Sequence, residues 1–158
     1  MIDYKISPNF LLSEMTKSTT ALKNGIKNEP SVGAIVALTA FTNNVIQPAR
    51  VHFGIPFAPS SGYSCLALGK LLGRSETSQH AKGEASDFEI SGVDNYELAL
   101  WLSENVTFDQ IILEHYTKGE PSSGWVHASF TCHGKNRGDL RHTEFNKDGE
   151  LHYPSGLI

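Results

Sequence analysis

A histidine and an aspartate, His80 and Asp87, stand seven residues apart in a polar stretch of the chain. Gly83 lies between them, and glycine adopts positive φ most easily, so a turn is expected there. If residues 85–90 form a strand, alternation places Asp87 on the face opposite Phe88, away from the core. Such a pair, delivered from a loop and the next strand, provides two of the three protein ligands of a catalytic zinc ion, with water as the fourth.

A second histidine, in the segment 124–130, is the best candidate for the third ligand. Read as a strand, this segment has one apolar face, formed by Val126, Ala128 and Phe130. His127 therefore lies on the side opposite the packed core, as Asp87 does. Two such strands, adjacent in one sheet, would bring both side chains to one ion.

A carboxylate that could act as a base, Glu114, ends a third predicted strand at residues 108–116. The turn-rich segment 118–124 leads from there into the His127 strand, so the two strands should form a hairpin. Because zinc lowers the pKa of its bound water to about 7, a nearby carboxylate can take that proton and pass it to a leaving amine. Glu89 is a second candidate for the base. The alternative role for such a carboxylate is to orient the imidazole of a metal ligand.

Four further residues are candidates for contacting a substrate. Trp125 would either pack in the core or line a cleft. Ser78 and Ser129 would hydrogen-bond either backbone or substrate, and Tyr63 would stack in the same cleft.

These residues resemble a known family, the zinc D-alanyl-D-alanine carboxypeptidases and the phage endolysin L-alanyl-D-glutamate peptidases, which cut peptidoglycan peptides. The family pattern Ser-x-His-x-x-Gly-x-Ala-x-Asp is met at residues 78–87. The later patterns Gln-Leu-Ile-x-Glu and Trp-Val-His-x-Ser resemble residues 110–114 and 125–129. A similar opening at residues 7–14 and a helix that ends near Gln47-Pro48 extend the likeness over most of the chain.

The resemblance implies an α+β fold of the hedgehog type, with helices packed on a small antiparallel sheet and a zinc cleft on that sheet. It implies that His80, Asp87 and His127 hold zinc and that Glu114 is the base.

The chain also departs from the family pattern. Ser64 follows Ser-Gly-Tyr where relatives carry an arginine that would hold the substrate carboxylate. Gly69 stands where asparagine is expected, and Gly124 stands where some branches place an acidic base. Arg74 and Arg50 are candidates to replace the missing arginine, the alternative being an ordinary solvated charge.

The composition limits the class of protein. A chain of 158 residues with 39% hydrophobic and 19% charged residues suits one globular domain, so we expect a single zinc peptidase domain over 1–158. The formal charge of -4 and the absence of a basic run argue against a nucleic-acid surface. No apolar run approaches the roughly 20 residues that span a bilayer, so we expect no membrane insertion.

The start of the chain has no signal-peptide pattern, so we expect synthesis in the cytoplasm as a monomer. By analogy with the family, action on the cell wall would follow holin-dependent release or carriage by a virion. Cys65 and Cys132 fit no metal-binding spacing, and two buried thiols are expected, with a disulfide as the alternative.

The elements that position these residues are predicted from periodicity. A long helix should open at Ser31 and end or kink at Pro48. Its expected apolar stripe is Val32, Ile35, Val36, Leu38, Thr39, Phe41, Val45 and Ile46. Residues 7–30 should be irregular apart from one short packed turn.

Shorter elements are predicted around the site. We expect a strand at residues 58–63, a helix from a Ser64 cap to Leu71, and a helix that begins with a capping box at Asp94. A last hairpin should pair residues 140–145 with residues 150–153.

The sequence therefore predicts a zinc peptidase that cuts either D-Ala-D-Ala or an L-Ala-D-amino-acid bond in peptidoglycan stem peptides. The sequence does not choose between these two bonds. The missing arginine favours a catalytically inactive module, and it would also fit a substrate without a free carboxyl terminus, for which endopeptidase but not carboxypeptidase action is expected. The alternatives are a catalytically inactive zinc-containing module that binds cell wall or protein, and a zinc hydrolase for a small non-wall amide.

Overall fold

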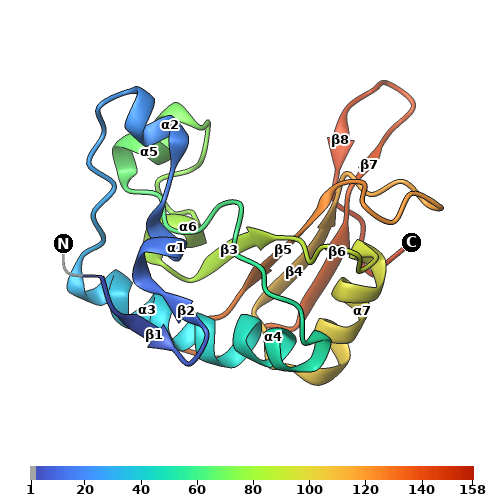
Figure 1. Ribbon diagram of the computed structural model, residues 1–158. Coiled ribbons are helices and arrows are strands. Elements are labelled where there is room, and N and C mark those ends of the chain that lie inside the picture. Colours follow the sequence, from blue (N-terminus) through green and yellow to red (C-terminus); the bar gives the residue numbers. More distant parts are fainter. Residues whose placement is uncertain (1–2) are drawn as a thin grey trace.

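A four-stranded sheet lies at the centre of the protein, and the computed structural model describes residues 3–158 (Figure 1). Its strands are β3 (Ala85–Phe88), β4 (Gln110–Glu114), β5 (Trp125–Ser129) and β6 (Asp139–His142), in the order β3-β5-β4-β6. The pairs β3–β5 and β4–β5 are antiparallel, whereas β4 and β6 are parallel. The predicted α+β class with a small, mainly antiparallel sheet is confirmed.

Alternation along the strands separates an apolar face of the sheet from a polar one. The apolar face is completely buried and consists of Phe88, Ile111, Leu113, Val126 and Ala128. Helices α3, α4 and α7 cover it (Figure 1). Each fully buried large side chain contributes about 1.5–3 kcal/mol. The opposite face carries the polar residues of the site.

The long helix opens at Ser31 as predicted, because the Ser31 hydroxyl accepts a hydrogen bond from Ala34 N at 3.2 Å. It continues without a break through α3 (Val32–Phe41), a π-helical turn η1 (Thr42–Ile46) and α4 (Gln47–Phe53). The predicted end near Pro48 is therefore wrong.

Two features explain why this helix differs from its prediction. Pro48 stands in the first turn of α4, after the wider π turn, where a missing N–H is tolerated. The apolar stripe is also displaced, because Val32 and Val36 are 79% and 53% exposed. The buried face is formed by Ala34, Ala37, Leu38, Phe41, Val45, Ile46 and Ala49.

The amino-terminal segment is more ordered than predicted. It contains β1 (Lys5–Ser7), β2 (Phe10–Leu11), α1 (Leu12–Thr16) and α2 (Thr19–Lys23). The buried Leu12 and Met15 of α1 are the packed turn that was expected. Elements of two to five residues are too short to show a periodicity, which is why the sequence did not reveal the others.

Three further helices follow in the chain: α5 (Leu66–Leu71), α6 (Gln79–Lys82) and α7 (Asn95–Asn105). The predicted start of α7 at Asp94 is confirmed, since the Asp94 carboxylate accepts from Tyr96 N at 2.8 Å. The expected capping box is not formed, because among the described residues Asp94 N donates no hydrogen bond to the Glu97 side chain.

The segment before α5 differs from its prediction in two ways. Its expected strand is reduced to a single bridge between Ser61 and Asp87. Ser64 does not cap α5, which begins after Cys65 without a side-chain cap.

The last hairpin is only partly as predicted. Residues 139–142 form β6 of the central sheet, and only β7 (Glu144–Phe145) and β8 (Leu151–His152) pair around the tight turn. In Figure 1 this hairpin rises above one end of the sheet, and α5 rises at the other.

Both cysteines are free thiols, so the disulfide alternative is wrong. The expected burial is also wrong for Cys132, which is exposed, while Cys65 is partly buried. Within residues 3–158, no helix is both long enough and apolar enough to cross a bilayer.

Candidate metal centre

Two predicted ligands face each other across neighbouring strands. Asp87 on β3 is paired in register with His127 on β5, so their side chains share one face of the sheet. Phe88 and Val126, one position further along, point into the core. The period of two seen in the sequence therefore places both polar side chains as expected.

The third predicted ligand, His80, lies on the short helix α6. Ser78 caps this helix by accepting a hydrogen bond from His80 N at 3.3 Å. Gly83 ends it in the left-handed region, with φ of 78°. A Cβ at position 83 would also collide with the backbone oxygen of Ala34, so only glycine fits where the loop meets α3.

The three side chains converge on one point. One ligand atom from each of His80, Asp87 and His127 lies within 4.8 Å of the others. His80 Nδ1 contacts the backbone oxygen of Gly62 at 2.8 Å, which leaves Nε2 directed at Asp87 Oδ1, 3.4 Å away. A ring held in this way through its other nitrogen is typical of metal-binding histidines. In the described part of the chain, no fourth His, Cys, Asp or Glu joins the group.

This donor set fits zinc. Two imidazoles and one carboxylate are ligands that zinc accepts, and three protein ligands leave a fourth position open, as in catalytic sites. The side chains of His80 and His127 are 7% and 10% exposed, so the site is sheltered from solvent without being closed.

The carboxylate of Asp87 is ionised in this setting. Burial alone would raise its pKa, but hydrogen bonds from His127 and His80 outweigh burial and hold the pKa well below its usual range. A deprotonated carboxylate is the form that binds a metal.

Glu114, the predicted base, lies at the end of β4 on the same face of the sheet. It pairs with Trp125, two residues from His127 along β5. Burial raises the pKa of Glu114, and the charge of Asp87 adds to this, although the nearby His127 opposes it. Among residues 3–158, no side chain forms a hydrogen bond or ion pair with this carboxylate. The second candidate, Glu89, is exposed, contacts Asn95 at 3.3 Å and does not line the cleft.

Of the two arginines considered as replacements for the missing one, only Arg74 reaches the site. Arg74 Nη1 donates to Ser64 Oγ at 2.7 Å, so the guanidinium lies beside the position where relatives carry arginine. Its Nη2 contacts Asp87 Oδ2 at 3.1 Å. Arg50 lies on α4 and does not line the cleft.

A cleft with a volume of about 1140 Å³ surrounds the three ligands. Glu114, Ser78 and Trp125 are among the residues that line it. The structure does not bring Tyr63 or Ser129 into it. Tyr63 is 8% exposed and packs in the core. Ser129 is completely buried, and its hydroxyl hydrogen-bonds the backbone of Gln110.

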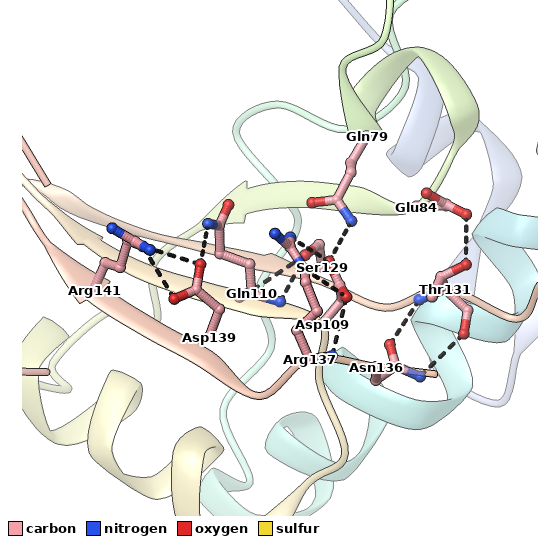
Figure 2. A network of polar contacts seen from close by, with 10 residues as sticks. All are labelled: Gln79, Glu84, Asp109, Gln110, Ser129, Thr131, Asn136, Arg137, Asp139 and Arg141. Atoms are coloured by element: carbon pink, nitrogen blue, oxygen red, sulfur yellow. Dashed lines mark hydrogen bonds and ion pairs between the residues drawn. The ribbon is translucent and has the colours of Figure 1, made fainter. Parts of the chain in front are cut away.

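A polar network runs along the floor of the cleft, between α6 and the sheet (Figure 2). Its centre is Asp109, which is 5% exposed and accepts from Gln79 Nε2 at 2.9 Å and from the Arg137 guanidinium. Hydrogen bonds from Arg137 outweigh burial and lower the pKa of Asp109. Because Gln79 precedes His80, the network ties the ligand helix to the segment that leads into β4.

Several cleft residues were not predicted. Asp109 and Arg137 come from loops, and Tyr153 follows β8 at the far wall of the cleft. A loop residue has no periodicity that assigns it to a face. For Asp109, its place directly before a buried strand was a usable signal, whereas nothing local marks Arg137 or Tyr153.

The comparison with protein families identifies one match. A family model described as Peptidase M15 matches residues 8–128, well over half of the chain. That span contains His80, Asp87, Glu114 and His127. No curated protein sequence matches this chain significantly.

Proposed function

Because this chain belongs to the peptidase M15 family, we propose that it is a zinc peptidase that cuts within peptidoglycan stem peptides. The observation that carries the proposal is the convergence of His80, Asp87 and His127 beside an unpartnered Glu114 in one cleft. The same residues also argue against a purely structural metal site, which is closed by a fourth protein ligand.

The chemistry divides between the metal and the chain. Zinc, when bound, supplies a Lewis acid that polarises a carbonyl and lowers the pKa of a coordinated water. The two histidines and Asp87 would hold it at the sheltered side of the cleft. Glu114 takes a proton on its carboxylate from the attacking water and delivers it to the nitrogen of the leaving amine. Its raised pKa suits both steps, because the group must accept and then release that proton.

The shape of the cleft favours a peptide over a small amide. Its volume of about 1140 Å³ exceeds the roughly 300–1,000 Å³ typical of small-molecule sites. Its lining comes from several separate parts of the chain, among them the loop before α6, Arg137 and Tyr153. A peptide fits a space of this size.

We further propose endopeptidase action, as at an L-Ala-D-Glu bond, over removal of a terminal D-Ala. The cation nearest the ligands, Arg74, is already engaged by Asp87 and two serine hydroxyls. It is therefore not free to pair with a terminal carboxylate. Phage-encoded lysis, with release by a holin or carriage in a virion, is the setting that we propose for this activity.

The decisive experiment is a digest of purified sacculi by the zinc-loaded protein, with the soluble products identified by mass spectrometry. We expect fragments whose new ends identify an internal stem-peptide bond. The matched control is Glu114→Gln, which keeps the shape of the side chain and should lower the rate by about 10²–10⁴-fold with zinc still bound.

Three other outcomes would change the proposal. Release of free D-Ala from a pentapeptide would identify a carboxypeptidase instead. Zinc binding without any fragments would identify an inactive module that binds cell wall or protein. Fragments produced equally by Glu114→Gln would show that another group is the base.

A further inference from the structure

The guanidinium of Arg74 holds one particular oxygen of Asp87. Arg74 Nη2 lies 3.1 Å from Asp87 Oδ2, whereas the two histidines contact the other oxygen, Oδ1. His127 Nδ1 is 2.9 Å and His80 Nε2 is 3.4 Å from Oδ1. The two carboxylate oxygens therefore have separate partners, and only Oδ1 points to the centre of the ligand group.

Arg74 reaches this position through contacts that fix it on three sides. Its backbone N donates to Gly69 O at 2.8 Å, in the turn that follows α5. Its guanidinium donates to Ser64 Oγ at 2.7 Å and to Ser61 Oγ at 3.1 Å. The side chain is 21% exposed, so most of it is packed inside the wall of the cleft.

The segment 60–64 joins Arg74 to both ligand-bearing elements. Ser61 exchanges backbone hydrogen bonds with Asp87, and Ser64 N donates to His80 O at 3.2 Å. The same short segment therefore fixes the ligand backbones and receives the guanidinium. Small hydroxyl side chains at positions 61 and 64 leave the volume that the guanidinium fills.

A carboxylate can bind a metal through one oxygen or through both. With Oδ2 held by a charge-assisted hydrogen bond, Asp87 has only Oδ1 to offer. A single-oxygen contact preserves a four-coordinate site with one open position, whereas chelation by both oxygens would occupy that position.

We propose that Arg74 is a positioning residue that reserves Oδ2 of Asp87 and limits this ligand to one oxygen. It acts from the turn after α5 in place of an arginine at position 64. The inference rests on the proposed metal site, but it does not depend on peptidase activity.

Cobalt(II) substitution tests this directly, because four-coordinate cobalt absorbs visible light more strongly than cobalt with five or six ligands. We expect the wild-type protein to show the strong band and Arg74→Ala to lose most of it, since Oδ2 becomes free to join the metal. Arg50→Ala is the matched control and should keep the wild-type spectrum. Adding Ser64→Arg to Arg74→Ala should restore the band, because a guanidinium returns from the other position.

A second variant separates hydrogen bonding from charge. Arg74→Lys keeps the positive charge but lacks the planar fork of donors. Its metal affinity, measured by competition with a chelator, should be about tenfold weaker than that of the wild type. This comparison also serves if Arg74→Ala fails to fold.

The outcomes distinguish this inference from the proposed function. A protein that takes up no cobalt would overturn the metal site and this inference together. Uptake with unchanged spectra in the Arg74 variants, or unchanged affinity in Arg74→Lys, would overturn the inference alone. If adding Ser64→Arg to Arg74→Ala does not restore the band, the claim that Arg74 acts in place of an arginine at position 64 is overturned.

Discussion

At the scale of single residues, the role proposed for the Glu114 carboxylate comes with a cost in stability. Burial and the charge of Asp87 raise its pKa in the folded protein. The folded state then binds the proton more tightly than the unfolded state does. The contribution of Glu114 is therefore most favourable below the unfolded pKa of about 4.3 and is lost as the pH rises through the folded pKa.

The raised pKa of Glu114 predicts how Glu114→Gln changes the unfolding temperature of the metal-free protein. At pH 7 the variant should unfold at a higher temperature than the wild type, because it lacks a partly buried charge with no ion-pair partner among the described residues. Near pH 3.5 the two proteins should unfold together. Thermal unfolding in the presence of a chelator at both pH values measures this, with the exposed Glu120→Gln as a control that leaves the unfolding temperature unchanged. A lower unfolding temperature for Glu114→Gln at pH 7 would contradict the assignment.

Strand phase predicted that Asp87 and His127 share one face of the sheet, whereas the choice of His80 as a third ligand rested mostly on the family resemblance. Asp87 and His127 each sit opposite an apolar neighbour on a strand, so their shared face followed from a period of two. Arg74 was named only as one candidate of two. Its contact with Asp87 depends on the path of the loop between α5 and α6, which no local pattern specifies.

At the scale of elements, the packing of α6 against α3 determines where His80 lies. Gly83 and Gly92 have nearly the same backbone conformation, with φ of 78° and 80°. A Cβ at Gly83 would collide with Ala34 O, whereas a Cβ at Gly92 would meet nothing within 4 Å. The two glycines therefore separate backbone strain from steric exclusion.

Alanine substitution at both positions tests this difference. Gly92→Ala should cost about 1–2 kcal/mol, which is the penalty of a left-handed residue with a side chain. Gly83→Ala should cost about 2 kcal/mol more, because α6 must move away from α3. Denaturant unfolding of both variants provides the free energies. Equal losses would mean that the loop yields without strain, and weaker zinc binding by Gly83→Ala would show that the movement reaches His80.

The predicted elements were correct where a local sequence signal specifies the structure, and they were wrong where contacts with distant segments specify it. The helix opening at Ser31 and the hairpin of β4 and β5 followed from local signals. The continuation past Pro48 depends on a π turn, and the pairing of β6 with β4 is parallel and distant in sequence. Neither the continued helix nor the parallel pairing has a local sequence signal.

At the scale of the whole molecule, the proposed zinc ion would join parts of the chain that are distant in sequence. His80 and Asp87 belong to one local segment, whereas His127 comes from the central strand β5. A ligand that binds only the folded state stabilises it by mass action.

Free zinc at a hundred times its dissociation constant should therefore add about 2.7 kcal/mol to the free energy of unfolding. For a domain of this size the unfolding temperature should rise by roughly 5–10 °C. Calorimetry with zinc and with a chelator measures the shift, and His127→Ala should abolish it. A chelator-treated wild type that unfolds at the same temperature as the zinc-loaded protein would argue against the site.

The position of β5 between β3 and β4 also determines when the proposed metal ligands can come together in a chain that is still being synthesised. Asp87 leaves the ribosome 40 residues before His127. The hairpin of β4 and β5 joins neighbouring segments of the chain, whereas the pairing of β3 with β5 spans the intervening α7 and β4. Until β5 has been synthesised and has paired with β3, a nascent chain therefore has no complete set of the proposed metal ligands.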